Sequence, residues 1–135
     1  MNEKITLYLA VFMVGGVFGW VLDTAHRSLV IGYYSSGTLI PFFSLIFGTG
    51  TVMLYKLFQY RCIPFLLSIT IGTALSVLLE LVSGIISRSI LNYNLWDYSA
   101  NPFNFYGIID LEHAFYWFLI TVAYKFSMDH LNKQK

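Results

Sequence analysis

The sequence predicts an all-α membrane protein, a four-transmembrane-helix bundle with an aromatic extracytoplasmic loop between its third and fourth helices. Two observations carry this prediction. Hydrophobic residues make up 57% of the chain and charged residues only 11%, against about 25% charged residues in an average soluble domain. The chain also contains four apolar runs of roughly 20 residues, the length that crosses about 30 Å of hydrocarbon. We therefore expect residues 1–135 to form a single integral membrane domain.

The four apolar runs define the expected helices. The first could be mistaken for a secretory signal, because Lys4 precedes it. However, no small-residue cleavage site follows, and the run ends in polar residues, so we interpret it as a retained helix. The predicted helices cover residues 5–29, 39–60, 63–87 and 105–126.

Basic residues predict the orientation of these helices. An even number of spans places both termini on the same side as the connection between the second and third spans. Only Arg27 and Arg88 belong to the other side. By the positive-inside rule, both termini are cytoplasmic and the chain is a multi-pass protein of the cell (plasma) membrane. The cytoplasmic side then holds six of the eight basic residues: Lys4, Lys56, Arg61, Lys125, Lys133 and Lys135.

The net charge and the cysteine content exclude some classes of partner and cofactor. A formal net charge of +1 provides no basic surface for nucleic acid. Membrane lipids are the expected surroundings. Because four helices scarcely enclose a full pathway, we also expect a homo-oligomer, such as a dimer, or a membrane partner protein. Cys62 is the only cysteine, which excludes an intrachain disulfide and a multi-thiolate metal site. No cofactor is predicted, although a divalent metal stays possible.

Five of the seven acidic residues lie within or beside the apolar runs, and all can be placed toward the outer face of the membrane. A carboxylate near hydrocarbon is costly, so it usually persists where it pairs with a cation, faces a wet cavity or does chemistry. At about 1.5 Å per residue, three of the five lie roughly 5 to 8 Å outward of the middle of their helices. The five acids are Asp23, Glu80, Asp97, Asp110 and Glu112.

Small residues accompany the acids at helical spacing. Such stripes are packing surfaces between helices in lipid. We therefore expect a compact bundle with a polar seam that opens outward. The clearest stripes are Gly72, Ser76, Glu80, Gly84 and Arg88 in the third span, and Gly16, Gly19, Asp23 and His26 in the first.

The connection between the third and fourth spans is rich in aromatic residues. Trp96, Tyr98 and Phe103 suit the lipid headgroup layer. Asn104 is positioned to cap the fourth helix. Two readings stay open for this segment, a membrane-surface anchor and a lid over the polar layer.

A set of positions distributed over most of the chain carries a resemblance to a known family. It comprises the stretch WDYSANPFNFYGIIDLE from Trp96 to Glu112, Glu80, Gly84 and Arg88 upstream of it, Gly19-Trp20, and Phe47-Gly48. With this signature the chain resembles the type IV ABC-transporter permease family called CmpB-like, of which the eukaryotic transmembrane protein 229 group looks like a part. The resemblance implies a membrane site built around Glu80, Arg88, Asp97 and Glu112.

The excess of acid favours one function. Five carboxylates face only two arginines and two histidines in this layer, so we expect a transporter- or permease-like protein whose outward-facing acidic polar site binds a cation or a cationic small molecule. Two alternatives stay open: a structural or accessory membrane subunit held by an interhelical polar network, and an intramembrane lipid-modifying enzyme. No HExxH, GxSxG or P-loop motif supports the enzyme, and no catalytic or metal-ligating residue is assigned. The expected ligand-binding residues are Asp23, His26, Arg27, Glu80, Arg88, Trp96, Asp97, Tyr98, Asn104, Glu112 and His113.

Overall fold

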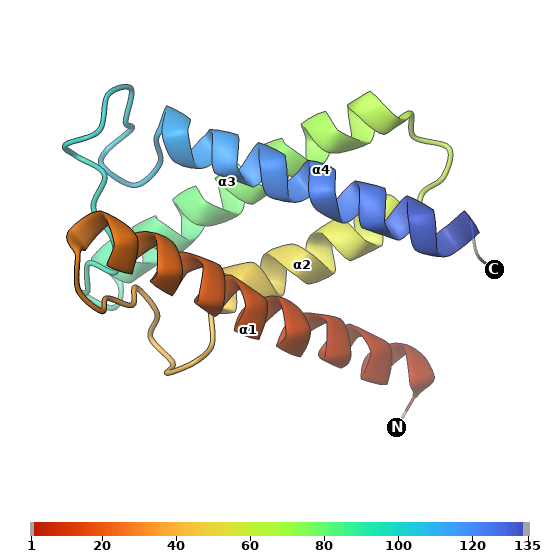
Figure 1. Cartoon of the computed structure of the whole chain (residues 1–135), viewed down its shortest axis with the longest axis horizontal. Helices are drawn as coiled ribbons and strands as arrows, with labels where there is room; N and C mark the ends of the chain where they lie inside the picture. Colours follow the sequence, from red (N-terminus) through yellow and green to blue (C-terminus); the bar gives the residue numbers. More distant parts are fainter. Residues whose placement is uncertain (1, 134–135) are drawn as a thin grey trace. The chain divides into compact units, whose positions relative to one another are not determined.

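The computed structural model describes residues 2–133 and is all-helical (Figure 1). It contains α1 (Glu3–Ile31), α2 (Leu45–Phe58), α3 (Phe65–Ser89) and α4 (Leu111–Lys133). The described residues form no strand, only two isolated bridges. The chain divides into two compact units, Met1–Tyr55 and Lys56–Lys135. The prediction of an all-α protein with four helices is thus confirmed.

Helix α1 has a clear beginning and end. The Asn2 side chain accepts a hydrogen bond from the backbone N–H of Lys4, which caps the helix. Gly32 ends it in the left-handed conformation, with φ of 86°, where a residue without Cβ carries no steric penalty. The 29 residues between these caps give a helix about 43 Å long, more than the hydrocarbon core requires.

Helix α2 is shorter than the sequence predicts, beginning at Leu45 rather than near residue 39 and ending at Phe58. Pro41 disfavours a helical conformation in the residue before it, and Phe42 has a positive φ of 62°. Ser44 then starts the helix, because its hydroxyl accepts the N–H of Phe47. The apolar pattern therefore continues through a segment that the backbone does not fold as a helix.

Glycines in the first unit make room for the segment that follows α1. A Cβ on Gly16 would lie 2.1 Å from the Phe43 ring, and a Cβ on Gly19 would lie 2.0 Å from the Phe47 side chain. Because Gly16 has no side chain to cover the helix backbone, its carbonyl can also accept a hydrogen bond from the Ser44 N–H at 2.9 Å. The glycine stripe of the first span is thus a packing surface, as predicted, and aromatic side chains of the same unit cover it.

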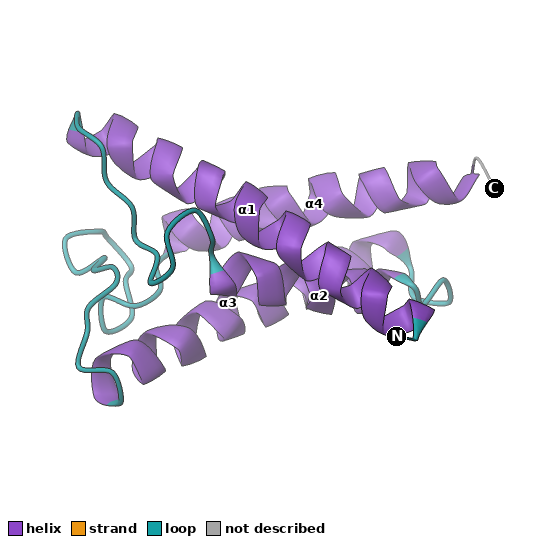
Figure 2. Ribbon diagram, turned by 90° about the horizontal axis from the view of Figure 1, so that it is seen from below, coloured by secondary structure: helices purple, strands orange, loops and turns teal. Residues whose placement is uncertain are grey.

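The second unit consists mainly of α3, α4 and the long connection between them, which Figure 2 shows in the loop colour. Helix α3 begins at Phe65, directly after Pro64, and ends at Ser89, close to the prediction. Helix α4 begins at Leu111 rather than near residue 105 and continues to Lys133. The predicted cap, Asn104, does not start it. Asp110 does, since its carboxylate accepts the N–H of His113 at 2.7 Å.

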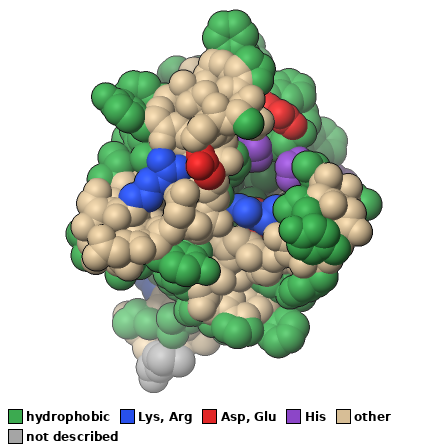
Figure 3. Space-filling view, turned by 90° about the vertical axis from the view of Figure 1, so that its left-hand side faces the viewer, with side chains coloured by type: hydrophobic (Ala, Val, Ile, Leu, Met, Phe, Trp, Pro, Cys, Tyr) green, Lys and Arg blue, Asp and Glu red, His purple; other side chains and the backbone are tan. Residues whose placement is uncertain are grey.

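Two of the four helices are long and apolar enough to cross a membrane. They are α1 and α3. In the most apolar 18-residue stretch of each helix, only 17% of the residues in α1 and 28% of those in α3 are buried. Leu29 is 84% exposed and Leu66 is 77% exposed. Figure 3 likewise shows hydrophobic side chains over much of one face, with acidic, basic and histidine side chains among them. Helix α2 is apolar but has only 14 residues, and α4, although long, is less apolar than α1 and α3.

Candidate functional site

Glu80 lies at the centre of the polar contacts in the second unit. It belongs to α3 and is 6% exposed. The Tyr98 hydroxyl donates to Oε1 at 3.1 Å, and the Trp117 indole N–H donates to Oε2 at 2.9 Å. One donor comes from the connection and the other from α4, so the carboxylate links three segments of this unit. Each carboxylate oxygen therefore has a neutral donor, which reduces the cost of burying it.

Tyr98 connects Glu80 to a second buried acid. Its ring stacks on the His113 ring, with centroids 3.8 Å apart and planes at 13°. The Nδ1 atom of His113 lies 2.7 Å from Oδ1 of Asp110. The second Asp110 oxygen accepts the side-chain amide of Asn101. The result is a continuous series of polar side chains from α3 through Tyr98 to the start of α4.

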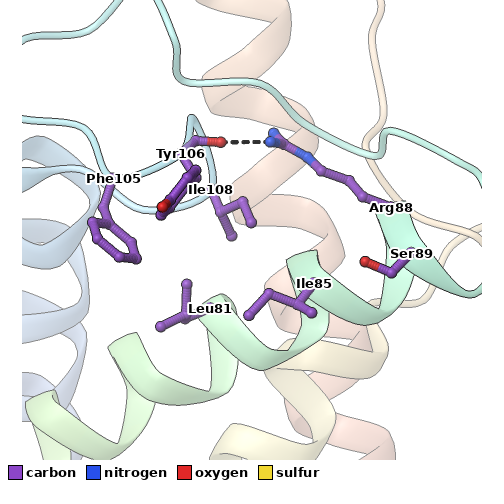
Figure 4. A pocket seen from close by; sticks show the side chains of 7 residues that line it. All are labelled: Leu81, Ile85, Arg88, Ser89, Phe105, Tyr106 and Ile108. Carbon is purple, nitrogen blue, oxygen red and sulfur yellow. Dashed lines mark hydrogen bonds between the residues drawn. The ribbon is translucent and has the colours of Figure 1, made fainter.

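Arg88 holds the connection in place (Figure 4). Its guanidinium donates to Oδ1 of Asn94 at 2.8 Å and to three backbone carbonyls, those of Trp96, Tyr106 and Gly107. Tyr106 and Gly107 both have positive φ, 53° and 62°, so these carbonyls belong to an unusual backbone conformation. The sequence predicts Arg88 as a ligand contact, whereas most of its donors are engaged within the chain.

Trp96 and Asn104 also serve the connection. Trp96 is 7% exposed, and its indole N–H donates to the Ile108 carbonyl at 2.8 Å, so this ring is buried rather than displayed at a surface. The Asn104 amide donates to the carbonyls of Ser99 and Asn101, and its oxygen accepts the N–H of Gly107. These bonds explain why Asn104 closes a turn instead of capping α4.

Asp97 is exposed at the edge of this segment. It accepts hydrogen bonds from the Ser99 hydroxyl and from the Ser99 N–H at 2.9 Å. Arg88 Nη2 lies 3.8 Å from it. The hydroxyl bond first, then the N–H bond, and finally the charge of Arg88 hold the pKa of Asp97 below its ordinary value of 3.8.

The lowered pKa of Asp97 predicts an acid limit for the order of the connection. Because the folded-state pKa lies below 3.8, the stabilisation from Asp97 is present above that pH and is lost as the pH falls through the folded-state pKa. We expect Trp96 fluorescence to shift as the pH falls below 3.8 and through the folded-state pKa of Asp97. In Asp97→Asn, which has no charge to lose, this shift should be absent. An identical acid transition in the variant would contradict the assignment.

The remaining predicted residues are Glu112 in the second unit and Asp23, His26 and Arg27 in the first. Glu112 is exposed on α4 and accepts the Tyr116 hydroxyl at 2.6 Å. Asp23 belongs to the first unit, where it accepts the Nε–H of Arg27 at 2.9 Å. It also accepts the N–H of Gly37 at 3.3 Å. His26 lies on the same helix, half-buried.

Several polar residues at the site were not predicted from the sequence. Trp117 and Asn101 carry donors that reach Glu80 and Asp110, but an indole and an amide in an aromatic-rich sequence give no signal of that role. The positive-inside rule concerns only the side of the membrane on which Lys125 lies, and its burial was not predicted: it is 7% exposed within α4. Between residues 2 and 133, no group of three or more His, Cys, Asp or Glu side chains is arranged to hold a metal ion.

Two helices are thus long and apolar enough to cross a membrane, and one of them, α3, carries the buried carboxylate of Glu80. The family model described as "Putative ABC-transporter type IV" matches residues 10–134. The chain belongs to this family, and it is therefore a transporter-related membrane protein. No solved structure matches the chain.

Proposed function

We propose that this transporter-related protein acts through an acidic polar site at which Glu80 takes up and releases a cation, and that this cation is the proton. The supporting observation is the pair of partners that hold the carboxylate, Tyr98 on one oxygen and Trp117 on the other. These two partners differ in what they can do when Glu80 changes its charge.

Trp117 can only donate, so Oε2 must remain an acceptor. The Tyr98 hydroxyl can both donate and accept, and it rotates about its C–O bond. When Oε1 carries a proton, that proton can be donated to the Tyr98 oxygen. Both charge states of Glu80 thus keep two hydrogen bonds at the same heavy-atom positions. A carboxyl that changes charge without rearranging its surroundings is suited to reversible proton binding.

Asp110 and His113 extend this site. Tyr98 stacks on His113, and His113 pairs with Asp110. An imidazole can accept a proton on one nitrogen and return one from the other. We propose that this pair exchanges protons between Glu80 and the connection before α4 through intervening water, since the stacked faces of Tyr98 and His113 carry no proton, and that the aromatic connection is extracytoplasmic. On this proposal the site opens outward.

The membrane topology belongs to the same proposal. We propose four spans in the cell membrane with both termini cytoplasmic. Helix α2 is only about 21 Å long at 1.5 Å per residue, so the irregular segment before it would complete the crossing, which requires cover by protein or a polar cavity. A dimer or a membrane partner protein would supply a full pathway, with membrane lipids around it.

Cys62 tests the topology. It is a free, exposed cysteine in the short connection between α2 and α3. A membrane-impermeant thiol reagent should therefore label it only when the cytoplasmic face is accessible, as in inverted vesicles. A cysteine introduced at Ser99, in a background without Cys62, should show the opposite pattern. Labelling of Cys62 from outside intact cells would reverse the topology.

A structural role is the second candidate, and Arg88 favours it. Four hydrogen bonds from this one side chain fasten the connection to α3, and the Glu80 partners also join three segments. Such a network would hold an accessory subunit together without binding a cation. Infrared spectra of the protein in lipid distinguish the two functions: reversible proton binding gives a protonated-carboxyl band that appears as the pH falls and is absent from Glu80→Gln.

A further inference from the structure

Two buried threonine hydroxyls in the second unit have no hydrogen-bond partner in the described part of the chain. They are Oγ1 of Thr73 on α3 and Oγ1 of Thr121 on α4. Thr121 is 0% exposed. A buried hydroxyl without a partner costs about 1 to 3 kcal/mol. Proteins commonly satisfy such groups with internal water.

Both hydroxyls lie on the seam between α3 and α4, two helices that pack against each other. The bond from Trp117 to Glu80 fixes which sides of the helices face one another. Thr121 lies one turn beyond Trp117 on the same side of α4. Thr73 lies two turns before Glu80 on the corresponding side of α3. Because α4 runs back along α3 (Figure 1), both threonines lie beyond Glu80 on the side away from the connection.

A buried cation lies further along the same side of α4. Lys125 follows Thr121 by one turn and is 7% exposed. Its Nζ atom bonds Oδ1 of Asp129 at 2.7 Å and lies 5.5 Å from the centre of the Phe58 ring. A buried ammonium requires polar partners. The charged pair therefore forms a polar end point to the seam.

We propose that the seam between α3 and α4 is a hydrated track that joins Glu80 to the pair formed by Lys125 and Asp129. Its ligand is water. Along α4, the steps from Trp117 to Thr121 and from Thr121 to Lys125 each cover about 6 Å. Since hydrogen-bonded oxygens lie about 2.8 Å apart, one or two water molecules complete each step. Thr73 and Thr121 supply the fixed hydroxyls between them.

The track would provide a proton path to and from Glu80, so this inference rests on the function proposed for Glu80. Each water or hydroxyl on the track accepts a proton from one neighbour and releases another proton to the next. A proton lost by the Glu80 carboxyl is thereby matched by one delivered at the Lys125 and Asp129 end, and no group on the track is consumed. Protons would reach Glu80 from the connection through His113 and leave along the track, or move in reverse.

Hydration of the track is measured directly by solid-state NMR of the parent protein in lipid bilayers. Polarisation transferred from water should reach Thr73 and Thr121 quickly, while the exposed lipid-facing side chain of Leu78 on α3 should receive it slowly. Equally slow transfer at all three residues would overturn the proposal. This measurement needs no variant, so it stands even where a substitution prevents folding.

Substitution of either threonine by valine gives a second test. A dry hydroxyl and a hydrated hydroxyl predict opposite changes in the melting temperature of the variant. A dry, unpartnered hydroxyl is costly, so its removal in Thr121→Val or Thr73→Val would raise the melting temperature. Removal of a hydroxyl that binds track water should instead lower it by about 3 °C. Thr70→Val is the matched control, since the Thr70 hydroxyl is exposed and bonds the Leu66 carbonyl of its own helix.

The two proposals fail differently. A parent protein whose Glu80 shows no protonated-carboxyl band at any pH would remove the proposed function, whatever the threonines do. Proton uptake by Glu80 together with dry threonines, or with a raised melting temperature in Thr121→Val, would remove only the track.

Discussion

Replacing Glu80 with glutamine is expected to abolish reversible proton binding while leaving the fold nearly unchanged. Glutamine keeps the shape of the side chain but loses the charge. Its oxygen can face Trp117, which only donates, and its amide can donate to the Tyr98 hydroxyl, which can rotate to accept. We therefore expect the free energy of unfolding to change by no more than about 1 kcal/mol. The pH-dependent carboxyl band should disappear completely.

Glu80→Ala is the informative contrast. It removes both acceptors and leaves the Tyr98 hydroxyl and the Trp117 N–H buried without the carboxylate. We expect a loss of about 2 to 4 kcal/mol of stability. Denaturant or thermal unfolding in detergent measures both variants. If glutamine destabilises the protein as much as alanine does, and the parent shows no carboxyl band, Glu80 is a structural hydrogen-bond partner and the accessory-subunit function is the better account.

Replacing Arg88 with alanine is expected to destabilise the second unit by about 3 kcal/mol or more. The change removes four hydrogen bonds and leaves three carbonyls of the connection without their charged donor. Two of those carbonyls belong to residues with positive φ, which the guanidinium helps to hold. The connection should become sensitive to protease before the helices unfold, and Trp96 fluorescence should shift toward that of an exposed indole.

Arg88→Lys separates charge from geometry. Lysine keeps the positive charge but lacks the planar fork that reaches several acceptors at once. We expect it to lose most of the stability that alanine loses. Arg61→Ala, at an exposed position in the same unit, is the control and should change stability by less than about 0.5 kcal/mol. Full stability in Arg88→Lys would mean that the charge of Arg88, and not its hydrogen bonds, is what the protein requires.

The ends of the helices show where hydrophobic pattern stops being informative. The apolar run through residues 39–44 resembles a helix in composition, but Pro41 and the positive φ of Phe42 keep it irregular. Residues 105–110 are equally apolar, yet the chain turns there and α4 begins only after Asp110. Side-chain capping and local backbone strain decide these boundaries, and average hydropathy does not contain them.

The sequence by itself determined that this is an all-helical membrane protein with an acid in its third apolar run, because hydrocarbon thickness and the cost of a buried charge act on composition and spacing alone. Its membership of a transporter-related family follows instead from particular motifs, above all the stretch from Trp96 to Glu112. Only the tertiary structure decided what that acid contacts. Tyr98 and Trp117 reach Glu80 from segments 18 and 37 residues away, and Arg88 is directed to backbone carbonyls instead of a carboxylate cluster. Lys125 is likewise buried on α4, which no pattern in the sequence indicates. Partners of this kind depend on how helices pack and where a chain turns, which are properties of distances in space.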